Sequence, residues 1–283
     1  MDLSNYPITH AEEIKKLVSL YLAEDVGDGD LTAALVPTDR VVGKIISREA
    51  GTLCGIAFAN EIFAQIDNSI EIDWHFSDSD ALQPNDKLCT IHGSARSVLT
   101  AERCALNILQ TLSGTASVTK TYSDLLKPYK TRLLDTRKTI PGLRNAQKYA
   151  VLCGGGTNHR IGLYDGILIK ENHLRSGKTL EEVVNLALST APKNALVEIE
   201  VETIDELQRA LKTPITRVLL DDFTIEAMRE AVAIVAGRIE LEASGNVTKN
   251  NITNIAATGV DFISTSAIIK NLKALDLSLL FDY

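Results

Sequence analysis

The second half of the chain alternates short apolar segments with amphipathic helical segments, and this rhythm limits its fold more than any other feature. Between the apolar segments, helical spacing predicts helices such as 179–189, 204–211 and 224–235. The six expected strands are 131–135, 166–170, 196–201, 217–221, 239–243 and 260–264. Strands and helices in alternation are typical of a parallel sheet covered on both faces. Because a full barrel needs eight strands, we expect an α/β fold that is either an incomplete parallel barrel or an open doubly wound sheet.

The first part of the chain, to about residue 113, has a different pattern. Thr9 and Glu12 predict a capping box at the start of a helix, which should end before the Gly-Asp run at 27–30. Helical spacing returns at 94–111. The strand-like runs between them are 41–47, 52–58, 70–76 and 87–92. We therefore expect a mixed α and β domain at 1–113 and a second domain at 114–269.

Charge and composition exclude several classes of protein. The 283 residues carry a net charge of −8, which argues against a protein held to nucleic acid by general attraction to phosphate. Aromatic residues make up 5%, too few for base-stacking platforms. No apolar run approaches the roughly 20 residues that span a bilayer, and the N-terminus has no apolar signal core. The four cysteines lack pairing or zinc-site spacing, so we expect a soluble cytoplasmic protein with reduced thiols.

Charged residues collect where the predicted strands of the second half end. Lys170 ends one apolar run, and Arg137 and Lys138 follow another. Glu198 and Glu200, Asp221 and Asp222, and the segment Ser244-Gly245-Asn246 mark three more strands. One such charge alone is best explained as a solvated strand end. Groups from five strands together indicate a binding site, because the carboxyl ends of parallel strands converge on one mouth.

The local charge points to a small anionic ligand. From Arg137 to Arg175 there are seven Lys and Arg residues against two acids, so the rest of the chain is more acidic still. A basic focus in an acidic protein attracts a small polyanion. Arg144 and Lys148 also fit a basic surface helix, whereas Lys170, at the end of an apolar strand, does not.

Two loops and two carboxylates indicate phosphate chemistry. The glycine run 154–156 is neither a P-loop nor a dinucleotide fingerprint and indicates only that the backbone turns tightly or approaches a ligand. Ser244-Gly245-Asn246 precedes a helix expected near Thr248, where free N–H groups would hold a phosphate, and 265–267 is the matching loop one unit later. Glu200 and Asp221 suit Mg²⁺ held together with substrate phosphates.

Longer motifs resemble one family, the quinolinate phosphoribosyltransferases. In the second half they are LDTRKT at 134–139, PGLR at 141–144, KYAV at 148–151, 153–160, LIKENH at 168–173, VEIEVE, LLDDF and LEASGN. In the first part they are 24–32 and 102–107. The resemblance runs in order along nearly the whole chain. It implies a head-to-tail homodimer, an open α/β sandwich domain at 1–113 joined by the C-terminal segment 270–283, and a barrel of fewer than eight strands.

The resemblance also implies a reaction and its residues. Phosphoribosyl would pass from 5-phosphoribosyl-1-pyrophosphate to quinolinate with loss of CO₂, giving nicotinate mononucleotide for NAD synthesis, with Mg²⁺ as cofactor. Quinolinate would be bound by Arg103 of the partner subunit, Thr136, Arg137, His159, Arg160 and Lys170. Phosphoribosyl pyrophosphate would be bound by Lys138, Glu200, Asp221, Ser244, Gly245, Asn246, Thr265, Ser266 and Ala267. The implied catalytic residues are Lys138, Lys170, Glu200 and Asp221, with Glu200 and Asp221 holding Mg²⁺ directly or through water.

Two departures and two alternatives accompany this resemblance. Ser266 stands where the family often has glycine, and Asp222 stands where asparagine is common, so both bear on affinity for the phosphate and Mg²⁺. One alternative is a phosphoribosyltransferase of the same fold with another acceptor, as in the relative associated with molybdenum transport. The other is a non-catalytic protein that binds a phosphate ligand. The complete set of cations favours quinolinate over the first, and the presence of Lys138, Glu200 and Asp221 argues against the second.

Overall fold

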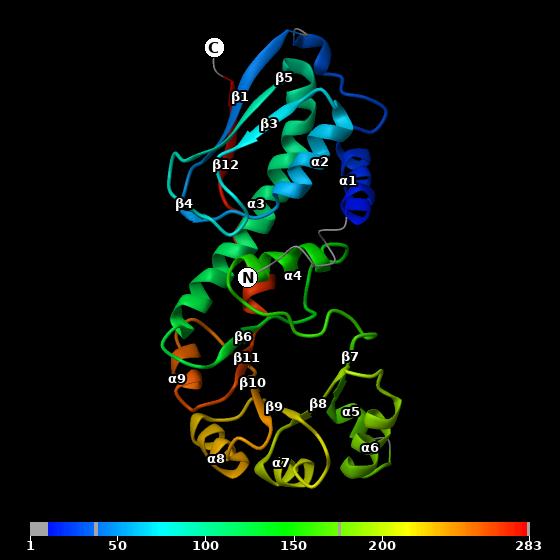
Figure 1. Ribbon diagram of the computed structural model, residues 1–283, viewed down its shortest axis with the longest axis vertical. Helices are drawn as coiled ribbons and strands as arrows, with labels where there is room; N and C mark the ends of the chain where they lie inside the picture. Colours follow the sequence, from blue (N-terminus) through cyan, green and yellow to red (C-terminus); the bar gives the residue numbers. More distant parts are fainter. Residues whose placement is uncertain (1–10, 37–38, 175–176, 282–283) are drawn as a thin grey trace. The chain divides into compact units, whose positions relative to one another are not determined.

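The structure is a computed structural model that describes residues 11–36, 39–174 and 177–281. The chain forms two units, each with its own core (Figure 1). The first unit consists of Met1–Lys120, Asn145–Gly155 and Leu272–Tyr283, and the second of Thr121–Arg144 and Gly156–Asn271. The predicted boundary at residue 113 lies within one long helix, α3 (Ala95–Leu126). Thr9 of the predicted capping box lies outside the described residues.

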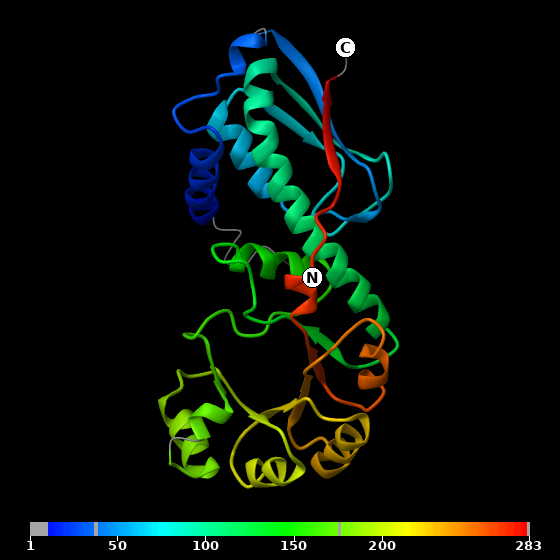
Figure 2. The ribbon, with the colours of Figure 1, turned by 180° about the vertical axis from the view of Figure 1, so that it is seen from behind.

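The first unit is built on an antiparallel sheet with the strand order β12-β1-β5-β3. The strands are β1 (Arg40–Ser47), β3 (Glu71–Trp74), β5 (Lys87–Ser94) and β12 (Leu277–Phe281), and β2 (Gly51–Thr52) pairs with β4 (Ala81–Leu82) in a separate ribbon. From behind, the C-terminal strand β12 lies at the sheet edge beside β1 (Figure 2). Gly43 pairs with Phe281, and Ser47 pairs with Leu277. The C-terminal segment thus completes the sheet of the first unit.

Helices α1 (Ala11–Asp25), α2 (Ile56–Ile66) and α3 up to Lys120 belong to the first unit, with a short 3₁₀ turn at Ala33–Leu35. The prediction of a strand at 52–58 is wrong beyond Thr52, because α2 begins at Ile56. Its buried residues Phe58, Ala59, Ile62 and Phe63 follow helical spacing, which a short apolar run conceals. The cap comes from a distant residue, since Asp78 Oδ1 accepts hydrogen bonds from the Gly55 and Ile56 amides at 2.9 and 3.2 Å.

Helix α4 (Arg144–Cys153) differs from the basic surface helix that Arg144 and Lys148 suggested. Lys148 is 0% exposed, and most of the helix is buried around it, including Ala150 and Val151. The surface prediction for Lys148 is therefore wrong. Charge alone does not predict exposure, because a lysine can be fully buried where it has interaction partners within the fold, as Lys148 has.

The second unit contains six parallel strands in the order β6-β11-β10-β9-β8-β7. They are β6 (Arg132–Leu134), β7 (Gly166–Ile169), β8 (Leu196–Val201), β9 (Arg217–Asp221), β10 (Glu240–Ser244) and β11 (Phe262–Ser264). All six predicted strands are confirmed. The order runs consecutively from β7 to β11, and β11 then pairs with β6, so the only neighbours that do not pair are β6 and β7. This order is that of a barrel with one open seam, which excludes the doubly wound alternative.

Helices cover the outer side of these strands (Figure 1). They are α5 (Glu171–Leu174), α6 (Leu180–Thr190), α7 (Ile204–Ala210), α8 (Ile225–Val235), α9 (Ile252–Ala256) and α10 (Ala267–Lys270). Side chains of Thr179, Thr203 and Thr224 cap α6, α7 and α8 by accepting a backbone N–H. The predicted helix near Thr248 begins later, at Ile252, because residues 249–251 form a turn first.

The barrel strands are buried as predicted, with one chemical exception. Val218, Leu219 and Leu220 of β9 are all buried, as expected for a strand covered on both faces. Glu198 of β8 and Glu242 of β10 are also buried, at 0% and 1% exposure.

Among the described residues, no helix has the length and apolar character required to cross a bilayer. The four cysteines are free and buried.

Candidate active site

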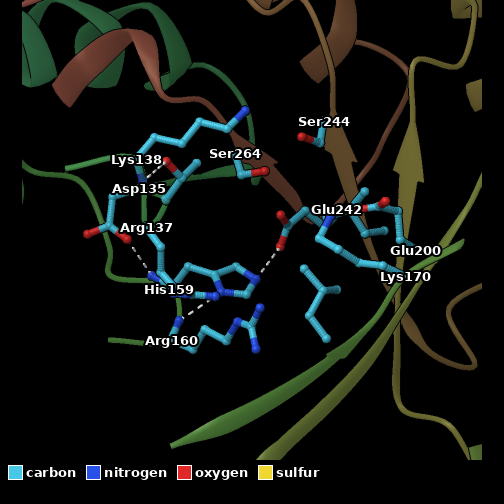
Figure 3. Close-up of a pocket in the computed structure, with 13 residues that line it drawn as sticks. Asp135, Arg137, Lys138, His159, Arg160, Lys170, Glu200, Glu242, Ser244 and Ser264 are labelled. Atoms are coloured by element: carbon cyan, nitrogen blue, oxygen red, sulfur yellow. Dashed lines mark hydrogen bonds and ion pairs between the residues drawn. The ribbon is translucent and has the colours of Figure 1, made fainter. Parts of the chain in front are cut away.

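A cavity of about 350 Å³ lies at the carboxyl ends of the barrel strands (Figure 3). The loop after β6 contributes four of the side chains that line it, and β8, β10 and β11 each contribute at least one from the last residues of the strand. Lys170 directly follows β7. The lining residues are Asp135, Thr136, Arg137, Lys138, His159, Arg160, Leu168, Lys170, Glu200, Leu219, Glu242, Ser244 and Ser264. The predicted convergence of the strand ends on one mouth is thus observed.

Cations from three segments face this cavity. Arg137 and Arg160 lie on the same side of it, and Lys170 lies on the side of β8 and β10 (Figure 3). The pKa of Arg160 is lowered by burial and then by the positive charge of Arg137. Lys170 Nζ forms an ion pair with Glu200. The arrangement offers separated positive groups around a space that can hold a small anion with more than one negative group.

The segment after α4 reaches the cavity by pairing with β6. The Thr157 amide donates to the Leu133 carbonyl at 2.8 Å, and the Asp135 amide donates to the Thr157 carbonyl at 3.1 Å. The buried Asp135 carboxylate then accepts from the Asn158 side chain at 2.6 Å and from the His159 amide at 2.8 Å. These bonds fix the backbone from which His159 and Arg160 extend into the cavity.

The run 154–156 contains the tight turn that was expected, because Gly155 has φ +82°. At Gly154 a side chain would collide with the backbone and side chains of α3, at Ala116 and Thr119. The close approach at Gly154 is therefore to the protein's own helix. Its contacts lie in the first unit, whereas His159 and Arg160 belong to the second.

Below the mouth, the ring of His159 contacts two buried carboxyl groups. Its Nε2 lies 2.8 Å from Glu198 Oε2 and 3.4 Å from Glu242 Oε2. Burial lowers the pKa of His159, but the two carboxylates outweigh it and raise the pKa to about 9. The Arg160 amide donates to Nδ1 at 2.8 Å, which acts in the opposite direction and favours the ring with its hydrogen on Nε2. Burial, and then the charge of Glu242, raise the pKa of Glu198 to about 7.

A second group of residues forms a turn beside the end of β9. Gly245 has φ +98°, and any side chain there would collide with the Asp222 carboxylate. Asn246 Nδ2 donates to Asp222 Oδ1 at 3.0 Å, and the Asp222 amide donates to the Ser244 carbonyl at 3.0 Å. Gly245, Asn246 and Asp222 line a separate cavity of about 290 Å³. The turn thus joins the loops that follow β9 and β10.

Comparison with known proteins identifies the family. The family model described as "Quinolinate phosphoribosyl transferase, C-terminal domain" matches residues 115–280, and the corresponding N-terminal domain matches residues 30–113. Together these matches cover most of the chain. The chain belongs to the quinolinate phosphoribosyltransferase family.

Relatives of this family resemble the chain over most of its length. A quinolinate phosphoribosyltransferase [decarboxylating] 1b of Nicotiana tabacum is 39% identical over 95% of this chain and 83% of its own length. The solved nicotinate-nucleotide pyrophosphorylase of Francisella tularensis is 48% identical, with a TM-score of 0.94, over 96% of this chain and 97% of its own. That of Ehrlichia chaffeensis is 34% identical, with a TM-score of 0.89, over 94% and 98%.

The family's implied site residues fall into five groups in this structure. Thr136, Arg137, Lys138, His159, Arg160, Lys170, Glu200 and Ser244 line the main cavity. Gly245 and Asn246 line the second cavity. Asp221 lines neither, but it interacts electrostatically with Glu200, Lys170 and Lys138. Thr265, Ser266 and Ala267 also line neither of these two cavities. Arg103 is exposed on α3, in the first unit.

Three polar residues that line the cavity, Asp135, Glu242 and Ser264, were not predicted from the sequence as site residues. A signal for Glu242 was available, because Glu240, Glu242 and Ser244 alternate along one strand and alternate residues share a face. Since Ser244 was expected at the mouth, Glu242 had to lie one layer below it. Asp135 stood inside a quoted motif, but its role in fixing the 157–159 backbone depends on a pairing that no local pattern indicates.

Two clusters of side chains among the described residues each bring three possible metal-ligand atoms within 4.8 Å of one another. One is His159 with Glu198 and Glu242, and the other is Cys54 with Asp78 and Cys153. In the second cluster Asp78 already caps α2 and accepts from the Tyr149 hydroxyl at 2.8 Å. The family's implied metal ligands, Glu200 and Asp221, form neither cluster. As a pair of carboxylates at the mouth they fit an ion that takes few protein ligands.

Proposed function

We propose that this chain transfers phosphoribosyl from 5-phosphoribosyl-1-pyrophosphate to quinolinate with loss of CO₂. The products are nicotinate mononucleotide and pyrophosphate, a step of de novo NAD synthesis. The chain is then a pentosyltransferase of the nicotinate-nucleotide pyrophosphorylase (carboxylating) type. One observation carries the assignment to this chain. Arg137, Arg160 and Lys170 surround a cavity whose size suits an aromatic ring with two carboxylates.

Recognition of quinolinate rests on the arginines. Each guanidinium presents a planar fork that matches a carboxylate. Arg137 can therefore hold one carboxylate of quinolinate, and Arg160 can hold the other. Arg160 is oriented by its own bond from Nη1 to the Gly166 carbonyl, at 3.1 Å. His159 has its Nε2 turned toward Glu198, and we assign it the task of fixing the Arg160 backbone beside it. Leu168 and Leu219 supply the apolar surface for the ring.

We propose that Glu200 and Asp221 hold Mg²⁺ through water on the pyrophosphate side. Burial, and then the negative charges of Glu200 and Asp222, raise the pKa of Asp221. Crowded carboxylates of this kind favour a divalent cation, and Mg²⁺ keeps several waters while it binds phosphates. When bound, the ion would neutralise charge on the leaving pyrophosphate. Lys138 provides a further cation for the pyrophosphate.

The ribose 5-phosphate is assigned to the loops after β10 and β11. Gly245 has φ +98°, so the backbone turns tightly there, and we assign the N–H groups of this turn to the phosphate. Ser244 extends this region into the main cavity. The loop of Thr265, Ser266 and Ala267 is ordered by a bond in which the Ala267 amide donates to Thr265 Oγ1, at 3.1 Å. Transfer passes through an oxocarbenium-like state at the sugar carbon, which carboxylates of the mouth stabilise as positive charge develops.

We further propose a homodimer in which Arg103 of the partner subunit completes the quinolinate site. The exposure of Arg103 on α3 supports a role outside its own subunit's core. The free, buried state of the four cysteines supports a reducing compartment, and we propose the cytoplasm.

The assay that tests the function follows two products together. The protein is incubated with quinolinate, phosphoribosyl pyrophosphate and Mg²⁺, and we expect nicotinate mononucleotide and CO₂ in equal amounts. Chelation of Mg²⁺ should stop both. If folded protein forms neither product, another ring acceptor is the alternative, and if it binds phosphoribosyl pyrophosphate without turnover with any acceptor, the protein is a binding module.

Arg137→Ala is expected to weaken quinolinate binding by about a hundredfold while the fold persists. In this variant one carboxylate of quinolinate loses its charge-assisted bidentate contact. The loss is roughly 3 kcal/mol, which corresponds to about a hundredfold in affinity. Arg229→Ala on the exposed face of α8 is the matched control and should bind quinolinate like the wild type. Calorimetric titration measures both. Wild-type affinity in Arg137→Ala would refute the acceptor site.

A further inference from the structure

Glu242 is a buried carboxyl group that faces the cavity without a role in the assignments above. It lies on β10 two residues before Ser244, and its side chain is 1% exposed. It lines the same cavity as Arg137 and Arg160. Figure 3 shows the carboxyl group directed toward the His159 ring, between the arginine side of the cavity and the side of Lys170.

Neither carboxyl oxygen of Glu242 has a hydrogen-bond partner within the described part of the chain. Its ion-pair partner, His159 Nε2, stands 3.4 Å away, but that nitrogen is closer to Glu198 Oε2, at 2.8 Å. The other ring nitrogen accepts the Arg160 amide hydrogen. A buried carboxyl group without hydrogen-bond partners is costly to the fold, so a functional role is expected of it. Glu242 thus keeps its hydrogen-bonding capacity for a ligand of the cavity.

Binding of the proposed substrate favours a proton on this carboxyl group. Quinolinate brings two carboxylates into a cavity of about 350 Å³, and an ionised Glu242 would repel them there. A neutral Glu242 leaves the attraction of Arg137, Arg160 and Lys170 undiminished. It also presents an O–H group to the space that the ring occupies.

The reaction needs such a group. When the bond from ring carbon 2 to its carboxylate breaks, CO₂ leaves and the electron pair stays on carbon 2, beside the cationic ring nitrogen. A proton must then bond to that carbon to form nicotinate mononucleotide. Lysine and arginine side chains are weak acids at neutral pH. The Nε2 hydrogen of His159 is directed to Glu198.

We propose that Glu242 is the catalytic acid that delivers this proton to carbon 2. The O–H bond of the carboxyl group breaks, the new C–H bond forms with the ring's electron pair, and Glu242 is left as a carboxylate. That carboxylate stands beside His159 Nε2, which stabilises it until Glu242 takes a new proton from water as the next quinolinate binds. Glu198 and His159 are positioning residues in this scheme. The inference rests on the proposed function, because the proton is needed only if the acceptor loses CO₂.

Glu242→Gln tests the proposal, since glutamine keeps the shape and has no acidic proton. General acid catalysis typically contributes 10²–10⁴-fold, so we expect kcat to fall by at least about a hundredfold, with the KM for quinolinate changed by less than about threefold. The second readout is the ratio of hydrogen to deuterium at carbon 2 of the product formed in mixed H₂O and D₂O. The ratio should change in Glu242→Gln, because the donor to carbon changes from a carboxyl group to water. A purely structural defect would slow the reaction and leave this ratio unaltered.

Glu240→Gln is the matched control. Glu240 lies on the same strand and pairs with Arg217 at 2.5 Å, outside the residues that line the cavity, so its variant should keep the wild-type rate and ratio. Glu242→Asp supplies a second reading where glutamine prevents folding. It retains a carboxyl group and should turn over slowly with the wild-type isotope ratio. A wild-type kcat, or a wild-type ratio, in Glu242→Gln would overturn the proposal, as would an altered ratio in Glu242→Asp. Failure of the wild-type protein to form nicotinate mononucleotide would instead remove the proposed function itself.

Discussion

At the scale of single residues, the buried pair Glu198 and His159 makes the stability of the fold depend on pH. Glu198 has a pKa raised from 4.5 to about 7, and His159 has a pKa raised from 6.5 to about 9. Both groups therefore hold their protons more tightly in the folded chain than in the unfolded chain. The stability they contribute is complete below about pH 4.5 and is lost as the pH rises through 7 and then through 9.

Glu198→Gln should flatten this pH dependence. Glutamine does not titrate, and its amide no longer raises the pKa of His159 as a carboxylate does. The wild type should lose on the order of 3 kcal/mol between pH 4.5 and pH 9 relative to the variant. Urea unfolding across this range measures the difference. The control is Glu202→Gln, an exposed carboxyl just past the same strand, which should keep the wild-type slope. Parallel curves for Glu198→Gln and the wild type would contradict the assignment.

At the scale of elements, the turn after β10 makes a sharper prediction than any helix. Gly245→Ala must adopt φ near +98° and also displace the Asp222 carboxylate, so both loops that flank the second cavity shift. We expect the KM for phosphoribosyl pyrophosphate to rise by about tenfold or more. Gly237→Ala is matched to it, because Gly237 has φ +74° with no atom within 4 Å of the added carbon. That control should lose only about 1 kcal/mol of stability and keep its KM.

The elements also show how far the sequence could predict this fold. Strands β6 to β11 were predictable because each is a short apolar run between helical segments. Helix α2 was not, since its N-terminus is capped by Asp78 from a loop 22 residues later. The buried state of Lys148 was hidden for a similar reason, because burial of α4 depends on packing partners distant in the chain. Elements whose structure depends on neighbouring residues can be predicted from the sequence. Elements that depend on a contact with a residue distant in the chain cannot.

The candidate site divides in the same way. Arg137, Lys170 and Glu200 were predictable because strand ends of a parallel sheet meet at one place. Asp135 and Glu242 were not assigned, since their importance arises from residues distant in the sequence, the 157–159 backbone beside Asp135 and the His159 ring beside Glu242. The interior of this barrel holds charged groups where branched apolar residues usually pack. Charge in the core marks residues placed for chemistry, at a cost in stability.

At the scale of the whole molecule, the open question is whether two chains share each site. If Arg103 acts on the partner's quinolinate, a chain with Arg103→Ala and a chain with Arg137→Ala should complement each other. Each variant alone forms only defective sites. In mixed dimers, one of the two sites takes Arg137 from the first chain and Arg103 from the second, and is complete. Random assembly of equal amounts then restores about one quarter of wild-type activity, because half the dimers are mixed and each has one intact site.

The two arrangements give opposite results in this experiment. If Arg103 served its own subunit, every site in the mixed dimer would lack one arginine, and activity would stay at the level of the single variants. The two chains are expressed together, and dimers that carry one copy of each are purified through two different affinity tags and assayed for nicotinate mononucleotide. Recovery near half the wild-type rate in these purified mixed dimers is expected. Their inactivity, with the dimer intact by light scattering, would confine the site to one chain and remove the role proposed for the partner.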